Sequence, residues 1–288
     1  MKRFFVVTLA IVLALSLSGL AFAENETIDN KAYVDQAGSL NAASVAQESG
    51  INTAGVSQSG RENSTNLRQG GYETNDGVVA TYASVSQVGN KNAADVDQVG
   101  ARYNNQLHQA FVVQDGEHNY ASIVQKSTYH GALAGIAQHG VNNTGVIEQV
   151  GNQFPSQGGY GSASIDQDGV SNYAKQWQRS YVNTGFMRAG IDQNGDHNYA
   201  TQGQDHRYVS TSAPGAFELY VTQNGYKNES IQHQGQEFGT RYGSVVQNGD
   251  RNYASQTQEM GNHVAGIVQN GNANWAVINQ YNSVPAAK

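Results

Sequence analysis

The side chains with the most regular spacing in this chain are carboxamides, whose chemistry is hydrogen bonding rather than bond cleavage. The stretch Gln247–Gln258 reads QNGDRNYASQTQ. Its skeleton is a glutamine (position 0), a glycine at +2, an asparagine at +5, a small residue at +7 and a closing glutamine at +11. Ten copies of this skeleton fit the chain, and self-similarity of this kind indicates a repeat architecture.

The glutamines and asparagines of the skeleton recur at the same three positions in every copy. The opening glutamines are Gln36, Gln58, Gln87, Gln114, Gln138, Gln167, Gln193, Gln223, Gln247 and Gln269. The asparagines at +5 are Asn41, Asn63, Asn92, Asn119, Asn143, Asn172, Asn198, Asn228, Asn252 and Asn274. The closing glutamines are Gln47, Gln69, Gln98, Gln125, Gln149, Gln178, Gln204, Gln234, Gln258 and Gln280. A lone amide is usually solvated, but a repeated column of amides predicts a buried ladder that stabilises stacked strands.

Residues that could support catalysis show no such order. Asp97, Asp166 and Asp192 are conceivable as an acidic site, but we expect them in different columns or in non-adjacent coils. His118 and His197 share position +4 two or more coils apart, which is too far for pairing. The chain has no cysteine, and it contains no nucleophile elbow, phosphate loop or zinc-protease motif. We therefore predict no enzymatic activity, no cofactor and no metal site.

Each copy alternates in a way that predicts two strands. Valine or isoleucine stands two places before every opening glutamine, and inward positions are expected at −2, 0 and +2 and then at +5, +7, +9 and +11. The phase changes once, between the glycine and the asparagine. Glycine permits a positive φ, and asparagine tolerates left-handed backbone while hydrogen-bonding around a corner. Each copy is thus predicted to be strand, tight turn, strand.

The spacing between copies predicts how these pairs of strands stack. The opening and closing glutamines are always 11 residues apart, whereas 11 to 19 residues separate a closing glutamine from the next opening one. Insertions confined to one connection are typical of a solenoid. We predict an all-β fold, a β-solenoid of about ten coils with its loops on one face.

Two further columns refine this prediction. Position +9 is apolar in copies one to five, an amide in copies six to nine, and apolar again in copy ten, as if neighbouring copies touched: Val45, Leu67, Val96, Ile123, Ile147, Gln176, Gln202, Gln232, Gln256 and Ile278. Position +6 is expected to face outward and carries recurring aromatics: Tyr120, Tyr173, Tyr199, Tyr253 and Trp275. These aromatics are either solvent-facing strand formers or an adhesive strip.

The N-terminus and composition indicate export. Residues 1–23 carry Lys2 and Arg3, an apolar run and Ala21-Phe22-Ala23, which is typical of a cleaved signal peptide; an uncleaved membrane anchor is the alternative. We expect a lead-in at 24–35, the solenoid at 36–280 and a tail at 281–288. The net charge is −7 and no basic stripe occurs, so we expect no nucleic-acid binding. No segment after residue 23 is apolar enough to cross a membrane, so we expect no stable membrane insertion.

The skeleton, seen whole in Gln247–Gln258 and in QVGNKNAADVDQ from Gln87 to Gln98, resembles the curlin repeat of bacterial curli subunits. The resemblance implies a secreted β-solenoid that self-associates into extracellular amyloid fibres of the biofilm matrix. It also implies other curli subunits, an outer-membrane secretion pore and periplasmic chaperones as partners. The glutamines and asparagines of the family motif are internal ladder residues, and they correspond to the three amide columns here.

The chain departs from the family pattern in ways that leave its exact role open. Major subunits commonly have glycine directly before the asparagine, whereas this position holds Leu40, Glu62, Lys91, His118, Asn142, Ser171, His197, Lys227, Arg251 and Ala273. The alternatives are a minor or nucleating fibre subunit and a non-polymerising secreted adhesin. Short flanks that offer no capping helix favour the fibre, because open terminal coils are templates for further chains.

Overall fold

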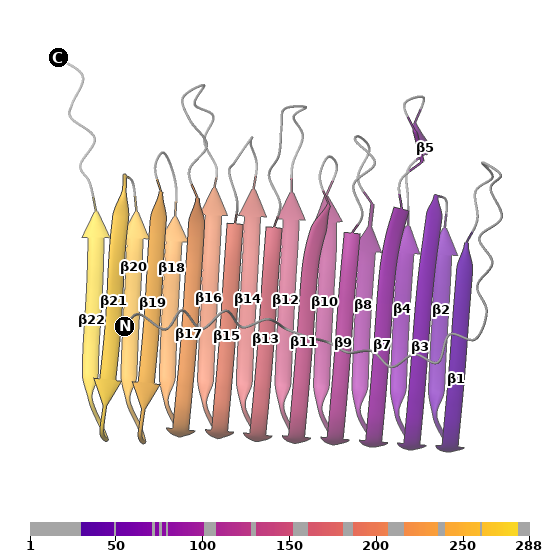
Figure 1. The fold of residues 1–288 in the computed structure, drawn as a ribbon, viewed down its shortest axis with the longest axis horizontal. Helices are drawn as coiled ribbons and strands as arrows, with labels where there is room; N and C mark the ends of the chain where they lie inside the picture. Colours follow the sequence, from indigo (N-terminus) through magenta and orange to yellow (C-terminus); the bar gives the residue numbers. More distant parts are fainter. Residues whose placement is uncertain are drawn as a thin grey trace, which may run out of the picture.

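The chain alternates between two β-sheets, each made of parallel strands, and every pair of strands forms one coil of a stack (Figure 1). The structure is a computed structural model that describes residues 30–48, 50–70, 73–74, 77–78, 80–100, 108–127, 131–151, 161–180, 187–206, 216–235, 240–259 and 261–281. Within these ranges each sheet has ten strands, and no helix occurs. The predicted all-β solenoid is confirmed.

The odd-numbered strands from β1 to β21, with β5 left out, form the first sheet. Its strands are β1 Lys31–Ser39, β3 Ile51–Arg61, β7 Ala80–Asn90, β9 His108–Glu117, β11 Ala132–Val141, β13 Gly161–Val170, β15 Met187–Asp196, β17 Phe217–Tyr226, β19 Arg241–Asn248 and β21 His263–Asn270. The second sheet comprises β2 Ala42–Glu48, β4 Ser64–Gly70, β8 Ala93–Val99, β10 Tyr120–Ser127, β12 Thr144–Gly151, β14 Tyr173–Ser180, β16 Tyr199–His206, β18 Glu229–Gly235, β20 Tyr253–Glu259 and β22 Trp275–Tyr281. A hairpin of β5 Glu73–Thr74 and β6 Gly77–Val78 stands apart.

The register between neighbouring coils follows the sequence repeat. In the first sheet Gln36 pairs with Gln58 and Gln58 with Gln87, and in the second sheet Gln47 pairs with Gln69. Residues at the same repeat position therefore lie directly above one another, whatever the number of residues between two copies. The strands of the two sheets alternate along the stack, so β1 is outermost at one end and β22 at the other (Figure 1).

The core between the sheets is partly polar, as the repeated amide columns predict. Aliphatic residues at −2, such as Val85 and Ile136, are buried together with small residues at +7, such as Ala121 and Ala200. The opening and closing glutamines of the inner coils are buried beside them. Because +7 is small, the two sheets approach closely enough for glutamine side chains to fill the remaining space.

The turn between the two strands of a coil differs from the prediction. We expected the asparagine at +5 to adopt left-handed backbone, but the residue before it does so in all ten coils, with φ between 55° and 58°. None of these ten residues is glycine, although left-handed backbone costs an ordinary residue roughly 1–2 kcal/mol. The asparagine instead keeps an ordinary φ, and its side chain forms the ladder described below.

The glycine at +2 was predicted to point inward, and this is also wrong. In every coil this glycine has a positive φ, for example 109° at Gly140 and 121° at Gly169. A Cβ atom on Gly140 would overlap the carbonyl oxygen of Gly169 in the next coil. The column is glycine because backbone of one coil lies where a side chain would be.

Several expectations fall partly outside the described residues. The signal peptide at 1–23 lies there entirely, as do 282–288 of the tail and most of the long connections. Strand β1 begins at Lys31, so the end of the expected lead-in belongs to the first strand. All second-sheet strands run parallel, so each ends at the same edge, from which the connection to the next coil departs. The path of the connections beyond that edge is not described.

Candidate assembly site

The opening glutamines form one continuous ladder through the core. The Nε2 amide of each donates to the Oε1 of the next, from Gln36 to Gln269, with distances of 2.6–2.8 Å. The second amide hydrogen is donated to a backbone carbonyl at position +6 of the preceding coil, for example from Gln114 to Ala93 at 3.0 Å. Both donors of each inner glutamine are thereby satisfied, which removes the cost of burying an amide.

The closing glutamines form a second ladder with the same direction. Their Nε2 amides donate to the next Oε1 from Gln47 to Gln280 at 2.7–3.2 Å. Each also donates to a backbone carbonyl of its own coil, as Gln98 does to Tyr82 at 3.1 Å. In both ladders the amide hydrogen that bonds the next glutamine points toward the C-terminal end of the stack, and the oxygen that accepts points toward the N-terminal end.

The asparagines at +5 form a third ladder that joins side chain to backbone. The Oδ1 atom of Asn119 accepts a hydrogen bond from the backbone nitrogen of Asn143 in the next coil at 3.0 Å. Its Nδ2 donates to the carbonyl of Gly140 at 2.9 Å. The same two bonds recur from coil to coil, so the asparagine fixes the turn that the left-handed residue creates. The three columns predicted from the sequence are thus brought together as predicted.

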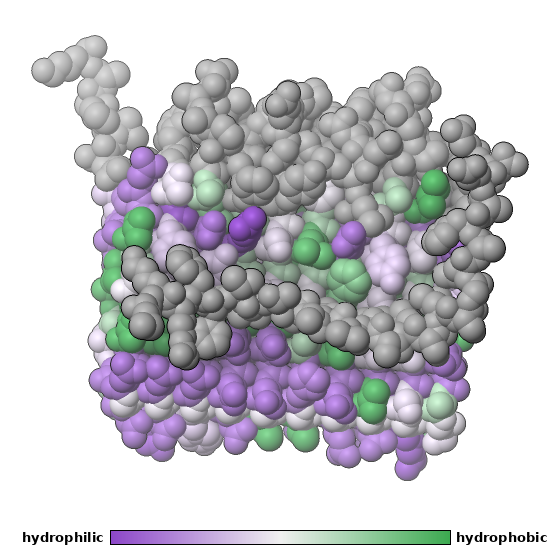
Figure 2. Space-filling model, viewed as in Figure 1, coloured by the Kyte–Doolittle hydropathy of each residue, from purple (hydrophilic) through white to green (hydrophobic). Residues whose placement is uncertain are grey.

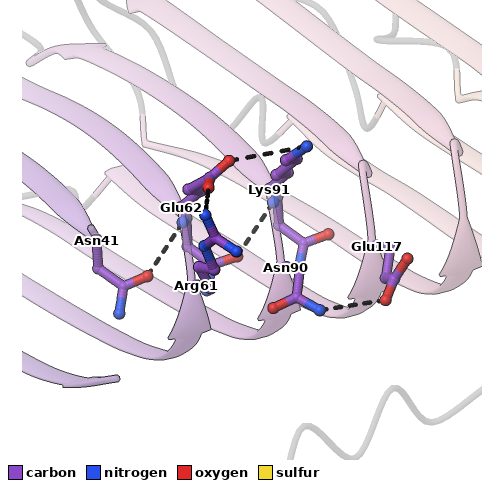
Figure 3. A network of polar contacts seen from close by, with 8 residues as sticks. Asn41, Arg61, Glu62, Asn90, Lys91 and Glu117 are labelled. Atoms are coloured by element: carbon purple, nitrogen blue, oxygen red, sulfur yellow. Dashed lines mark hydrogen bonds and ion pairs between the residues drawn. The ribbon is translucent and has the colours of Figure 1, made fainter. Parts of the chain in front are cut away.

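The outer surface of the turns carries a polar network between coils. Figure 3 shows Glu62 between two cations, with Arg61 Nη2 at 2.8 Å and Lys91 Nζ at 3.8 Å. Asn90 donates to Glu117 at 3.1 Å in the same region. Exposed pairs of this kind contribute less than about 1 kcal/mol each. They align the turns, but the buried ladders carry the stacking.

A fourth amide ladder lies on the outer face of the first sheet near the C-terminal end. Asn224 donates through Nδ2 to Oδ1 of Asn248 at 2.8 Å, and Asn248 donates in the same way to Asn270 at 2.8 Å. Each of these asparagines precedes the glycine at +2. The backbone nitrogens of Gly249 and Gly271 donate to the carbonyls of the preceding coil, at 2.9 Å each. This exterior ladder has no counterpart among the columns identified from the sequence.

The N-terminal end of the stack presents unused acceptors. Gln36 and Gln47 each donate to the next coil, but among the described residues no group donates to their Oε1 atoms. The backbone nitrogen of Asn63 donates to Oδ1 of Asn41 in the preceding coil at 3.0 Å. The backbone nitrogen of Asn41 is the equivalent donor in the first described coil, where no preceding coil supplies an asparagine oxygen. Strand β1 is exposed along most of its length, and Val34 is 50% exposed. Among the described residues, nothing covers this face of the first coil, which can form hydrogen bonds.

The C-terminal end presents the matching donors. Gln269 and Gln280 each donate one amide hydrogen to a backbone carbonyl, at 2.9 Å and 3.2 Å, and no glutamine follows to accept the other. The Oδ1 atom of Asn274 likewise has no asparagine nitrogen beyond it within the described ranges. Figure 2 shows hydrophobic surface gathered at this end. The exposed apolar side chains of the last coil are Val264, Val268, Trp275, Val277 and Tyr281.

The aromatics at +6 face outward and partly cover one another. Tyr173 stacks on Tyr199 with ring centroids 5.0 Å apart, and Tyr253 stacks on Trp275 at 4.0 Å. Tyr120 donates its hydroxyl to Asp95 at 3.0 Å, and burial followed by this contact raises the pKa of the tyrosine. The rings thus stabilise neighbouring strands by stacking in pairs, which agrees with the prediction that they lie on the outer face.

The carboxylates considered for catalysis are arranged differently from the expectation. Asp166 and Asp192 do share a column and lie on adjacent strands, where they are register partners. Loss of solvent raises the pKa of both, and the charge of Asp166 raises that of Asp192 further. Asp97 lies on the other sheet, where Lys126 contacts it at 3.2 Å. No group of three acidic or histidine side chains suited to a metal ion occurs in the described ranges.

One buried titratable residue was missed in the sequence. His108 is fully buried at the start of β9, and its Nδ1 accepts a hydrogen bond from the backbone nitrogen of Ala132 at 3.1 Å. Burial lowers the pKa of His108 to about 4. Its position, six places before the opening glutamine, also holds Asn30 and Asn52 in earlier coils, and that shared address was the available signal.

Comparison with known proteins adds no relative. No protein-family model matches the chain, and no curated protein matches it significantly. Among the residues that the structure describes, no helix is long and apolar enough to cross a membrane.

Proposed function

We propose that this protein is a structural subunit that polymerises end to end through its terminal coils. The observation that carries the proposal is the complementarity of the two end faces. One end offers amide donors at Gln269 and Gln280, and the other offers amide oxygens at Gln36 and Gln47. A second copy placed in register would continue every column of the core.

In-register stacking would satisfy each unused group at the ends. Gln269 would donate to Gln36 of the next copy and Gln280 to Gln47, as each glutamine does inside the stack. The backbone nitrogen of Asn41 would donate to Oδ1 of Asn274. Each such bond contributes on the order of 1 kcal/mol, and the exposed strand edges would add main-chain bonds along both sheets. The head-to-tail direction follows because two identical ends would bring donors against donors.

We infer the setting of these fibres from the resemblance to curlin repeats. The protein would be exported and would form functional amyloid fibres in the extracellular matrix of a biofilm, with a secretion pore, chaperones and other fibre subunits as partners. We also propose that the protein has no enzymatic activity. A nucleating subunit shares the same end faces and is included in the proposal. An adhesin that remains monomeric is the competing function.

The test compares two triple variants in seeded growth at equal monomer concentration. Replacing Gln269, Asn274 and Gln280 by alanine removes about three intermolecular bonds, so we expect a folded monomer whose affinity for fibre ends falls by roughly 100-fold. The matched control replaces Gln138, Asn143 and Gln149 in the middle of the stack. It should lower the melting temperature but leave both end faces able to elongate.

Two results would contradict the proposal. Equal elongation by the end and middle variants would show that the end ladders do not mediate growth. An unmodified mature chain that stays monomeric for days at high concentration, even with seeds, would favour the adhesin.

A further inference from the structure

The core column at +9 changes chemistry along the stack. It is aliphatic in the first five coils, where Leu67, Ile123 and Ile147 are fully buried. It becomes an amide ladder in the next four. Gln176 donates to Gln202 at 2.9 Å, Gln202 to Gln232 at 2.8 Å, and Gln232 to Gln256 at 3.0 Å. Within each block a coil rests on a neighbour of its own kind.

The amide block stops one coil before the end of the stack. Ile278 occupies this address in the last coil and is the register partner of Gln256. The amide of Gln256 therefore has no glutamine to donate to and bonds the backbone carbonyl of Ala265 at 3.2 Å instead. A glutamine at position 278 would extend the ladder by one bond. The amide ladder of the preceding four coils thus gives no reason for isoleucine here.

The contacts of a second copy do give a reason. The first coil carries Val45 at the same address, and both Val45 and Ile278 are only partly buried, each against the edge of the core. We infer that Ile278 is matched to Val45 of a second copy, so that the column is apolar on both sides of the junction and the chain recognises its own end. This inference rests on the proposed end-to-end assembly and names its selectivity-determining contact.

A column on the outer face shows the same matching. At position −3, Tyr220 packs its ring on Gly190 of the preceding coil, where a Cβ atom would come within 3.1 Å of Cδ1. Tyr33 stands at this position in the first coil, is 41% exposed and leaves the space over Gly55 of the following coil empty. Across the junction its preceding neighbour would be Gly266, where a Cβ atom would meet only the Ser244 hydroxyl. Tyr33 does not pack on Gly55, and on its preceding side, where Tyr220 finds Gly190, a second copy would supply Gly266.

Both columns point to a copy of this chain rather than to an unrelated strand edge. A partner with an amide opposite Ile278 would bury the oxygen of that amide without a donor, as happens to Oε1 of Gln176 beside Ile147. A partner with a large side chain opposite Tyr33 would keep its edge strand too far from strand β1 for main-chain hydrogen bonds. The end of the same chain meets both requirements, and its amide ladders continue on either side of the contact.

The test uses variants with opposite effects on the monomer and on the junction. Ile278→Gln should raise the melting temperature of the monomer, because Gln256 regains a side-chain acceptor, yet it should slow seeded elongation roughly tenfold or more. Ile278→Val should elongate like the unmodified chain. The double variant Val45→Gln with Ile278→Gln should recover most of the elongation rate, since the junction then pairs amide with amide.

The outcomes separate this inference from the proposed function. If the unmodified chain grows fibres and Ile278→Gln grows equally fast, the matching is refuted while end-to-end growth stands. If Ile278→Gln is slow and Val45→Gln does not restore growth in the double variant, the contact between these two residues is refuted. If the unmodified chain forms no fibres, the proposed function fails and this inference fails with it.

Discussion

At the scale of single residues, His108 makes the stability of the fold depend on pH. Its Nδ1 accepts the backbone N–H of Ala132, so protonation would place two donors face to face. Asn30 has the same role in the first coil, where it accepts the backbone N–H of Asn52 at 3.3 Å. Burial is the cause of the lowered pKa of about 4, and no charged side chain contributes to it. The folded protein therefore binds this proton less readily than the unfolded chain does.

The sign of the effect on stability follows from this difference. The pKa of the unfolded histidine is about 6.5, so between about pH 6.5 and 4 the unfolded state binds more protons. We expect His108 to cost the folded state on the order of 3 kcal/mol as the pH falls through this window. The matched variant is His108→Asn, which keeps an acceptor for Ala132 but does not titrate. Urea denaturation of both monomers at pH 7, 5.5 and 4.5 should give curves that diverge at low pH; parallel curves would contradict this assignment.

At the scale of the element, the turn depends on the glycine column. Gly140→Ala would force a Cβ atom into the carbonyl of Gly169 and an alanine into a φ of 109°. We expect it to lower the free energy of unfolding by about 3 kcal/mol or more. The control is Gly55→Ala in strand β3, where a Cβ atom meets nothing within 4 Å. It should change stability by less than about 1 kcal/mol, in the stabilising direction. Thermal unfolding below the concentration for assembly measures both, and similar losses would contradict the stacked-glycine turn.

The elements were largely predictable from the sequence because identical side chains recur at one spacing. The two strands of each coil, the parallel register and the buried amide columns all follow from that recurrence. The left-handed residue did not, since Lys91 or Leu40 gives no sign of unusual backbone and asparagine is the more common choice. The adjacency of Asp166 and Asp192 was accessible by counting from the opening glutamines. The shared direction of the ladders was not, because an amide in a sequence has no orientation.

At the scale of the whole molecule, the stack behaves as a row of interchangeable coils. Residues 247–268 span one full period, from one opening glutamine to the next. Deleting them joins Val246 to Gln269 and preserves the register and the end-face ladder residues Gln269, Asn274 and Gln280. Because each coil contacts only its neighbours, we expect a folded nine-coil protein that still elongates on unmodified seeds.

The control deletion removes half a period. Deleting residues 247–257 joins Val246 to Gln258 and removes the turn, so one strand would have to belong to both sheets. We expect this variant to lose stability strongly and to elongate poorly. Circular dichroism and seeded growth of both deletions are the measurements. A half-period deletion that is tolerated as well as the full period would contradict the coil as the unit of the fold.

The exterior asparagine ladder bears on how long such a fibre lasts. Asn248 and Asn270 each precede a glycine, and asparagine–glycine pairs age fastest in proteins because the glycine nitrogen attacks the asparagine side chain. Here those nitrogens, on Gly249 and Gly271, are held in hydrogen bonds to the preceding coil, and the asparagine side chains are tied to one another. The attack needs a backbone rotation that the stack forbids. We expect deamidation at these pairs to be slow in the folded chain and rapid in the unfolded chain. The fraction of deamidated Asn248 and Asn270 would then measure how long the chain had been unfolded.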